Sequence, residues 1–452
     1  MFDSMLSQRA RILNTLFEGY KGLSFSVRFW DGWNWIAPGE EKPVCTIVVS
    51  SASALRSLLI DPSEITLGEA FLSKEIDVEG DIFSVFDVAE HLFRRPRGQG
   101  QRFRETAAGV FAGAGSWLKR GKSHSIKRDR AAISYHYDQP VGFYRPWLGE
   151  SLAYSCAYFQ SPGDSIDTAQ TNKFELICRK LRLQPGERFL DIGCGWGGLI
   201  LHAASQHNVD AQGITISREQ AATASARIER EGLARSCRVD LLDYRDAPEK
   251  LGLFDKIASI GMFEHVGLKN LPLYFKTVHK LLKPGGVFLN HGIARGQFQG
   301  IRGASASCKR VAQFMRDVLR LRKPQSASFI DKYVFPDGEL VTISQAMRVA
   351  EGAGFEVRDV ENLREHYEIT LRRWVEGLQR NADALLRLVP ETTYRIWLLY
   401  TAGSAAAFKR GDIAIYQTLL SSPDRGKSGL PLRRDDWYLP SMAGAEDYAL
   451  RH

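Results

Sequence analysis

Short apolar runs alternate with longer amphipathic stretches from about residue 131 onward. The apolar runs predict strands at 188–192, 209–214, 237–241, 254–260, 286–291 and 355–360, and the stretches between them have helical periodicity. Lys283-Pro-Gly-Gly286 predicts a turn before the fifth strand. This alternation is typical of a mostly parallel sheet with helices on both faces. We therefore expect an α/β domain over residues 131–452.

The first ninety residues have a different pattern. Alternating runs at 23–29 and 45–49 predict strands, and helical periodicity follows near 51–60 and 82–93. This pattern predicts a small α+β domain over residues 1–93. The stretch 94–130 is rich in glycine, arginine, lysine and serine, which favours a basic linker between the two domains.

Composition indicates the compartment. Hydrophobic residues make up 44% and charged residues 25% of the chain, which is ordinary for a globular protein. The six cysteines form no C-x-x-C pair and no metal-ligand spacing, so we expect reduced thiols in a cytoplasmic protein and no metal site. No signal peptide is evident, and the longest apolar stretch, 396–408, is too short to cross a bilayer. A membrane association would therefore be peripheral.

The net charge of +8 indicates an anionic partner, either nucleic acid or a membrane surface. Basic residues gather at 94–104, 119–130 and 302–323 without zinc-finger or aromatic RNA-binding motifs, which disfavours nucleic acid. In the last of these stretches, apolar residues at 311, 314, 315, 318 and 319 share one helical face. Such a helix could lie on an anionic lipid surface or face a protein core.

A dense glycine cluster follows the first strand of the α/β domain, in Leu190-Asp-Ile-Gly-Cys-Gly-Trp-Gly-Gly198. Its glycines allow the backbone to approach a bulky ligand, and their spacing fits a dinucleotide loop. However, the second strand ends at Gly213-Ile-Thr-Ile-Ser217 without the carboxylate that would hold a ribose. Asp191 would also repel a pyrophosphate. The sulfonium and ammonium groups of S-adenosylmethionine suit it better, so the layout favours a methyltransferase.

Several further motifs show a family resemblance. The chain resembles the cyclopropane-fatty-acyl-phospholipid synthases and their mycolic-acid relatives from about residue 131 to 420. Besides the glycine loop, the matching motifs are Leu152-Ala-Tyr-Ser-Cys-Ala-Tyr-Phe159, Gly213-Ile-Thr-Ile-Ser-Arg-Glu-Gln220, Asp243-Tyr-Arg-Asp246, Gly261-Met-Phe-Glu-His-Val-Gly267, Tyr333-Val-Phe-Pro336 and Phe408-Lys-Arg-Gly-Asp-Ile413. The resemblance implies a Rossmann-like class I methyltransferase domain whose cofactor is S-adenosylmethionine. Residues 1–93 would correspond by position to the family's lipid-binding module.

The resemblance also implies the substrate and the cofactor contacts. The substrates would be unsaturated phospholipids at an anionic membrane surface, reached from the cytoplasmic side, and a homodimer would be common in such a family. Nucleic acid would not be a partner. Cofactor contacts are expected at Tyr154, Ser155, Asp191, Gly193, Cys194, Gly195, Gly197, Thr215, Ser217, Gln220, Asp243 and Tyr244.

In this family a cis double bond attacks the sulfonium methyl group, and the resulting carbocation loses a proton to close a cyclopropane ring. A bound bicarbonate ion is the base. Its expected ligands here are Cys156, Glu264, His291, the backbone of Ile293 and Tyr367. Taken singly, each has an ordinary structural role as an alternative, such as a buried thiol or a core histidine. Aromatic rings in or beside the motifs could stabilise the cation, namely Tyr154, Tyr158, Phe159, Phe263 and Tyr367.

Other activities stay open at this point. Ser404 stands where many relatives carry a cysteine, so a thiol nucleophile is not expected. The same donor and lipid could instead give methylene-, methyl- or hydroxy-branched acyl chains. A lipid-binding protein that kept the fold without catalysis, or a methyltransferase acting on RNA or a small molecule, are further alternatives.

Overall fold

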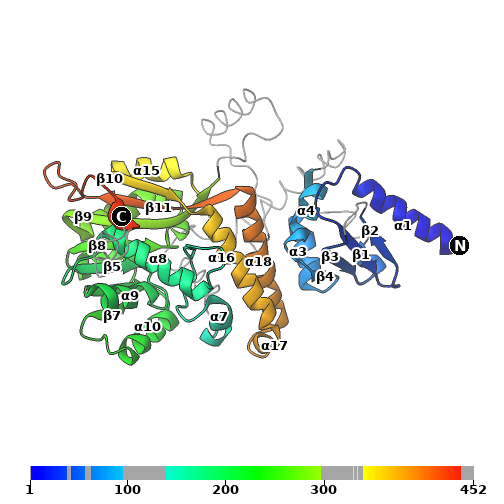
Figure 1. Ribbon diagram of the computed structural model, residues 1–452, viewed down its shortest axis with the longest axis horizontal. Coiled ribbons are helices and arrows are strands. Elements are labelled where there is room, and N and C mark those ends of the chain that lie inside the picture. The colour runs from blue at the N-terminus through cyan, green and yellow to red at the C-terminus, as the bar shows by residue number, and fades with distance from the viewer. Residues whose placement is uncertain are drawn as a thin grey trace, which may run out of the picture. The chain divides into compact units, whose positions relative to one another are not determined.

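The computed structural model describes residues 2–37, 42–55, 63–94, 139–296, 329, 333 and 339–438 (Figure 1). These residues divide into two compact units. The first contains the described residues up to 94, Phe329, Tyr333 and 378–407, and the second contains 139–296, 339–377 and 408–438. The domain boundaries expected from the sequence stay a prediction. The basic linker beyond residue 94 and the amphipathic helix expected at 311–319 lie outside the described residues.

The first unit contains a four-stranded sheet in the order β2-β1-β3-β4. β1 pairs with β3 in parallel, and the two outer pairings are antiparallel. Its N-terminal elements are α1 (Phe2–Leu16), β1 (Phe25–Phe29), β2 (Asn34–Ile36), β3 (Cys45–Val49), α3 (Glu64–Leu72), β4 (Ile76–Gly80) and α4 (Ser84–Arg94). A buried aromatic cluster that includes Phe17, Phe25 and Trp35 packs on this sheet. The expected α+β character of the N-terminal part is therefore confirmed.

The second unit contains a seven-stranded sheet in the order β10-β11-β9-β8-β5-β6-β7. The strands from β7 to β9 in this order are parallel, whereas β11 is antiparallel to both neighbours. The strands are β5 (Arg188–Ile192), β6 (Asp210–Thr215), β7 (Cys237–Leu241), β8 (Phe254–Ile260), β9 (Leu282–Arg295), β10 (Glu356–Asn362) and β11 (Ile413–Ser421). The predicted α/β class is confirmed.

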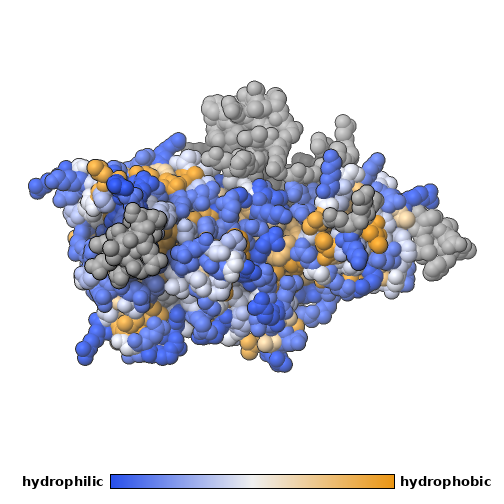
Figure 2. All heavy atoms as spheres, in the orientation of Figure 1, coloured by the Kyte–Doolittle hydropathy of each residue, from blue (hydrophilic) through white to orange (hydrophobic). Residues whose placement is uncertain are grey.

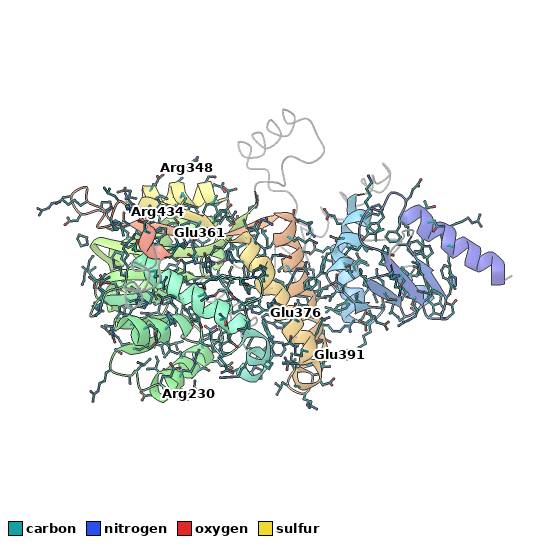
Figure 3. The ribbon with its side chains drawn as sticks, in the orientation of Figure 1. Arg230, Arg348, Glu361, Glu376, Glu391 and Arg434 are labelled. Atoms are coloured by element: carbon teal, nitrogen blue, oxygen red, sulfur yellow. The ribbon has the colours of Figure 1, made fainter. Side chains whose placement is uncertain are left out.

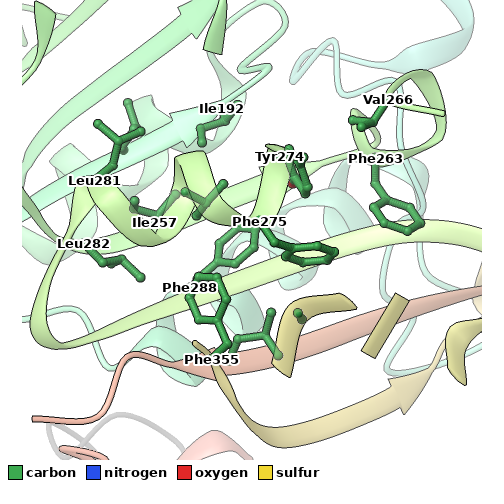
Figure 4. Packing of buried hydrophobic residues seen from close by; sticks show 14 of the residues in the cluster. Ile192, Ile257, Phe263, Val266, Tyr274, Phe275, Leu281, Leu282, Phe288 and Phe355 are labelled. Atoms are coloured by element: carbon green, nitrogen blue, oxygen red, sulfur yellow. The ribbon is translucent and has the colours of Figure 1, made fainter. Parts of the chain in front are cut away.

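Helices cover both faces of this sheet. One buried cluster joins the sheet to α8 and α9, and another joins it to α12 and α15. Figure 4 shows the second cluster, where the rings of Phe275 and Phe288 both pack against Phe355. The helices outside the N-terminal part are α7 (Val141–Leu148), α8 (Ile166–Leu181), α9 (Gly198–His207), α10 (Arg218–Arg230), α11 (Ala247–Lys250), α12 (Leu271–Leu281), α15 (Ile343–Gly352), α16 (Arg364–Arg380), α17 (Ala382–Leu385) and α18 (Glu391–Arg410).

Two details of the sheet differ from the sequence expectation. Lys283-Pro-Gly-Gly286 does not precede the fifth strand, since β9 already begins at Leu282. These four residues form a bulge, because the pairing with β8 jumps from Phe254–Leu282 to Lys256–Val287. β11 was not predicted at all. Nearly all its residues are buried, so it lacks the apolar–polar alternation that identifies a strand with one face in water.

The described residues on the face of the molecule seen in Figure 2 are mostly polar. Hydrophilic side chains cover most of the face seen in Figure 2, with hydrophobic ones scattered between them. Within the described ranges, none of the helices has both the length and the apolar character that a bilayer span would need.

Candidate functional site: a cofactor cavity beside a buried Glu–His pair

A cavity lies at the carboxyl edge of β5, β6 and β8, where the loops that follow these strands meet. Ten of the twelve expected cofactor residues line it: Tyr154, Ser155, Asp191, Gly193, Cys194, Gly195, Thr215, Gln220, Asp243 and Tyr244. Gly197 and Ser217 do not line it but begin the neighbouring helices. Ser217 Oγ accepts a hydrogen bond from the Gln220 N–H at the start of α10.

The glycine loop needs its small residues for local reasons. Gly197 has a φ of +84°, a region that favours glycine, and it caps the N-terminus of α9. A Cβ on the next residue, Gly198, would lie 2.8 Å from the Phe174 ring of α8. The loop therefore packs closely against α8 and leaves the space above β5 for a ligand.

Asp191, the penultimate residue of β5, lines the cavity. Its side chain is buried, and Oδ1 has no hydrogen-bond partner among the described residues. Burial raises the pKa of Asp191 to about 7, although the nearby Lys173 opposes that shift. A buried carboxylate oxygen without a partner is costly, and a cationic ligand would satisfy it.

Lys173 is a cavity residue that sequence reasoning missed. It lies on α8 and is only 1% exposed, its Nζ donates to Ser155 Oγ at 2.9 Å, and burial lowers its pKa to about 7. Gln170, one turn earlier, donates to the carbonyls of Ala153 and Ser155 at 3.1 and 2.9 Å. A lysine and a glutamine on the apolar face of a helix were the available signal, because buried polar groups require partners. Together they hold the 153–155 segment against the cavity.

The remaining polar cofactor residues form hydrogen bonds within the protein. Asp243 accepts hydrogen bonds from the Arg245 side chain at 2.9 and 2.7 Å, so its charge is compensated locally. Thr215 Oγ1 donates to Gln220 Oε1 at 2.8 Å. These pairs keep polar atoms at the rim of the cavity in fixed positions.

Glu264 and Ile293, two of the expected bicarbonate ligands, contact each other directly. Glu264 lies in the short 3-10 helix η2 (Phe263–His265) after β8, between the cavity residues Met262 and His265. Its Oε1 accepts the Ile293 N–H at 2.7 Å, so that amide already holds the carboxylate. Oε2 is buried and has no partner within the described ranges. Burial raises the pKa of Glu264 to about 7.

His291 is fully buried on β9, and its protonation is fixed by neighbours. Lys180 Nζ donates to Gln417 Oε1 at 2.8 Å, which orients the Gln417 amide so that Nε2 donates to His291 Nδ1 at 3.2 Å. Lys180 also forms an ion pair with Glu361, labelled in Figure 3. The proton of a neutral His291 must therefore be on Nε2, which is buried without a partner in the described structure.

The pKa of His291 lies well below its usual value, because burial and the nearby lysines Lys173 and Lys180 disfavour the cation. The side chain therefore stays neutral at physiological pH. Its Nε2–H is a hydrogen-bond donor without a positive charge, and it is available to a ligand.

The Cys156 thiol and the Tyr367 backbone N–H both point to the Leu363 carbonyl. The Cys156 Sγ lies 3.3 Å from the Ala157 carbonyl and 3.8 Å from the Leu363 carbonyl, which also accepts the Tyr367 N–H. Burial raises the pKa of the Cys156 thiol, so a reactive thiolate is not favoured. The Tyr367 ring packs against Phe408 with centroids 4.7 Å apart. None of the five expected catalytic residues lines the cofactor cavity itself.

Of the aromatic residues expected near a cation, Tyr154 lines the cavity, and its ring stacks on Trp374 at 5.2 Å. Tyr158 stacks on His366 at 4.6 Å, and the Phe263 ring lies in the hydrophobic core beside Tyr274. Tyr154 is therefore the ring best placed to face a cationic ligand.

The raised pKa of Glu264 predicts a pH-dependent stability. Below about pH 4.5 the group is protonated in both states; between pH 4.5 and 7 the folded protein keeps a proton that the unfolded chain releases. The free energy of unfolding of the ligand-free protein should fall over this interval by on the order of 3 kcal/mol. Asp191, whose pKa is also raised to about 7 by burial, adds a similar decline. In urea denaturation the free energy of unfolding of Glu264→Gln should therefore fall over this interval by about 3 kcal/mol less than that of the wild type. Parallel curves for wild type and variant would contradict the assignment.

The α/β unit with its cofactor cavity is similar to solved structures of cyclopropane synthases. The sheet order, the glycine loop and the acid near the end of β5, Asp191, define a Rossmann-like class I methyltransferase. One similar solved structure is the crystal structure of mycolic acid cyclopropane synthase CmaA1 complexed with SAH and CTAB. Its sequence is 33% identical to this one, and the match covers 64% of this chain and 97% of the CmaA1 chain with a TM-score of 0.56. Cyclopropane synthase MmaA2 from Mycobacterium tuberculosis is 32% identical with the same TM-score and coverage.

The family described as mycolic acid cyclopropane synthetase matches residues 124–418, and this chain belongs to it. A second family, described only as a domain of unknown function, matches residues 12–93. A probable fatty acid methyltransferase of Pseudomonas putida is 39% identical over 92% of this chain and 96% of its own length. Cyclopropane-fatty-acyl-phospholipid synthase of Escherichia coli K12 is 36% identical over 66% of this chain and 69% of its own. The protein is thus an S-adenosylmethionine-dependent methyltransferase of the cyclopropane synthase family.

Proposed function

We propose that this protein transfers a methylene group from S-adenosylmethionine to the cis double bond of unsaturated phospholipid acyl chains and forms a cyclopropane ring, with a bound bicarbonate ion as the base. The observation that carries the proposal is the presence of two buried atoms without a partner among the described residues, Glu264 Oε2 in the short helix that follows β8 and His291 Nε2 on the adjacent strand β9. One is an acceptor or a shared-proton site and the other is a neutral donor.

The residues of the cavity fit S-adenosylmethionine. When bound, this cofactor supplies an electrophilic methyl group on a sulfonium. Asp191 Oδ1 would face positive charge, and the glycine loop leaves its backbone accessible. Lys173 does not oppose this fit strongly, because burial lowers its pKa to about 7 and part of the population is neutral. Tyr154 would add an electron-rich ring to the wall of the site.

The residues of the Glu–His pair fit a bicarbonate ion. His291 Nε2–H can donate to an oxygen of the anion without needing a positive charge. A carboxylate beside an anion is unfavourable unless a proton is shared between them. With a pKa of about 7, Glu264 can share such a proton at physiological pH and orient the anion. The Leu363 carbonyl lies near the Cys156 thiol and accepts the Tyr367 N–H. Both Cys156 and Tyr367 are proposed to complete the bicarbonate site.

A branched product is the second candidate. The 39% identical relative from Pseudomonas putida is named a probable fatty acid methyltransferase, and a methyl transfer that ends in methylene-, methyl- or hydroxy-branched chains needs the same donor and lipid. The two outcomes differ in where the carbocation loses its proton or whether it gains a hydroxyl group.

We also propose where the protein acts and what it associates with. A phospholipid substrate and a net charge of +8 favour peripheral attachment to the anionic inner face of the membrane. We also propose a homodimer, as expected from the family resemblance.

Product analysis tests the function. The purified full chain is incubated with S-adenosylmethionine, bicarbonate and vesicles of monounsaturated phosphatidylglycerol and phosphatidylethanolamine, and the acyl chains are examined by mass spectrometry. A gain of one CH2 with ring fragments supports cyclopropane formation, whereas a terminal-methylene signal supports the branched product. Unchanged vesicle lipids together with methylation of a water-soluble acceptor would overturn the proposal.

A further inference from the structure

Four side chains of metal-ligand type gather between α8 and α9, and none of them lines the cofactor cavity. Glu175 and Cys178 come from α8, and His202 and His207 come from α9. Both histidine Nε2 atoms lie close to the same carboxylate oxygen, Glu175 Oε2, at 3.2 and 3.1 Å. Ligand atoms of Cys178, His202 and His207 all lie within 4.8 Å of one another.

We propose that Cys178, His202, His207 and Glu175 bind one Zn²⁺ ion. In tetrahedral zinc sites the metal lies about 2.0–2.2 Å from nitrogen and oxygen ligands, which places adjacent ligand atoms roughly 3.3 Å apart. The distances from Glu175 Oε2 to His202 Nε2 and His207 Nε2, 3.2 and 3.1 Å, are already close to this value. A Zn–S bond of about 2.3 Å places sulfur roughly 3.6 Å from each nitrogen. The ligand atoms of Cys178, His202 and His207 lie within 4.8 Å of one another, so zinc binding would draw these side chains closer together.

The chemistry of the ligands selects the metal. One thiol, two imidazoles and one carboxylate form a mixed set that suits Zn²⁺ and disfavours Mg²⁺ or Ca²⁺, which prefer oxygen ligands. On binding, Cys178 releases its thiol proton to solvent and becomes the thiolate ligand, and both histidines coordinate in the neutral form. Without a metal, each histidine donates its Nε2–H to the same carboxylate oxygen. On metal binding, the proton of each neutral ring would move from Nε2 to Nδ1, which frees Nε2 to coordinate the ion.

A neighbouring arginine holds one of the proposed ligands in position. Arg179 Nε donates to the other carboxylate oxygen, Glu175 Oε1, at 2.7 Å, and this contact orients the ligand from outside the coordination sphere. Cys178 is fully buried, whereas the side chains of His202 and His207 are 14% and 19% exposed. An ion could therefore enter from the histidine side and be held against the core.

Four protein ligands leave no open coordination position, which defines a structural rather than a catalytic zinc site. The ion would join α8, which carries Lys173 and Gln170, to α9, which begins at the glycine loop. The sequence showed no metal-ligand spacing because the ligands are spread over two helices and include only one cysteine. This proposal departs from the sequence expectation of no metal site, which stays a prediction until zinc binding is measured.

Metal binding to the purified full chain tests the site. After removal of metals with a chelator, the protein should take up one equivalent of zinc, measured by mass spectrometry of the metal after dialysis. Zinc at a hundredfold excess over its Kd should raise the unfolding temperature by roughly 3–5 °C. Co²⁺ in place of zinc should give a thiolate-to-cobalt absorption band and tetrahedral visible bands.

Matched variants separate this site from adventitious binding. His202→Gln combined with His207→Gln should weaken zinc affinity at least tenfold, and Cys178→Ser should abolish the thiolate band. Cys237→Ser, a change at another cysteine of the same buried cluster, should leave both readouts unchanged. If Cys178→Ser fails to fold, the histidine variant decides. Less than one equivalent of zinc in the wild type, or undiminished affinity in the histidine variant, would overturn the proposal.

Discussion

Glu264→Gln should lower turnover by about 10²–10⁴-fold while S-adenosylmethionine still binds with nearly unchanged affinity. Glutamine keeps the size of the side chain, and its amide oxygen can still accept the Ile293 N–H that Glu264 now binds at 2.7 Å. What it cannot do is exchange a proton at the position of Oε2, the buried atom that has no partner in the described structure. Methyl transfer to monounsaturated vesicles and calorimetric cofactor binding measure the two effects separately.

A carboxylate with the same kind of contact provides the control. Glu339 Oε2 accepts the Leu268 N–H at 3.0 Å, but Glu339 is exposed and does not line the cavity. Glu339→Gln should leave turnover unchanged. Full activity in Glu264→Gln would refute the proton-sharing role, whereas loss of cofactor binding in that variant would assign the residue to the cofactor site instead.

The sequence predicted the parallel part of the sheet well because its strands are short apolar runs separated by helices of clear periodicity. β5, β7 and β8 have the predicted limits. β11 was missed because a strand buried on both sides has no alternation, and because it pairs antiparallel with residues more than a hundred positions earlier in the chain. Local patterns do not contain such long-range pairing.

The candidate site divides in a similar way. The glycine loop and Asp191 could be predicted because glycine at such positions serves backbone geometry, which depends on local sequence. Lys173 could not, since its importance comes from a buried contact with Ser155 on another segment. A series of polar contacts links Glu361 to Lys180, Lys180 to Gln417 and Gln417 to His291. These residues belong to β10, α8, β11 and β9, and only folding brings them together. The cluster around Glu175 could not be predicted for the same reason, because its residues come from two helices that only folding brings together.

Asp191→Asn should weaken S-adenosylmethionine binding by about 10–100-fold, because a charge-assisted contact is worth roughly 1.5–3 kcal/mol. Asparagine fills the same space, but its amide lacks the negative charge that a sulfonium or ammonium group requires. The KM for the cofactor should rise by a similar factor, and kcat at saturating cofactor should fall much less. Isothermal titration with S-adenosylmethionine and steady-state kinetics on vesicles give both quantities.

The stability of the ligand-free variant distinguishes lost recognition from damaged structure. Burial raises the pKa of Asp191 to about 7, so at pH 8 the folded wild type contains a buried carboxylate that is costly to ionise. Asp191→Asn removes that cost, and the variant should unfold at the same temperature as the wild type or higher. Asp240→Asn on β7, whose carboxylate accepts a hydrogen bond from Gln212 and does not line the cavity, should leave cofactor affinity unchanged. If Asp191→Asn binds S-adenosylmethionine as tightly as the wild type, the unpartnered oxygen is not a cation site, and the charge argument for this cofactor fails.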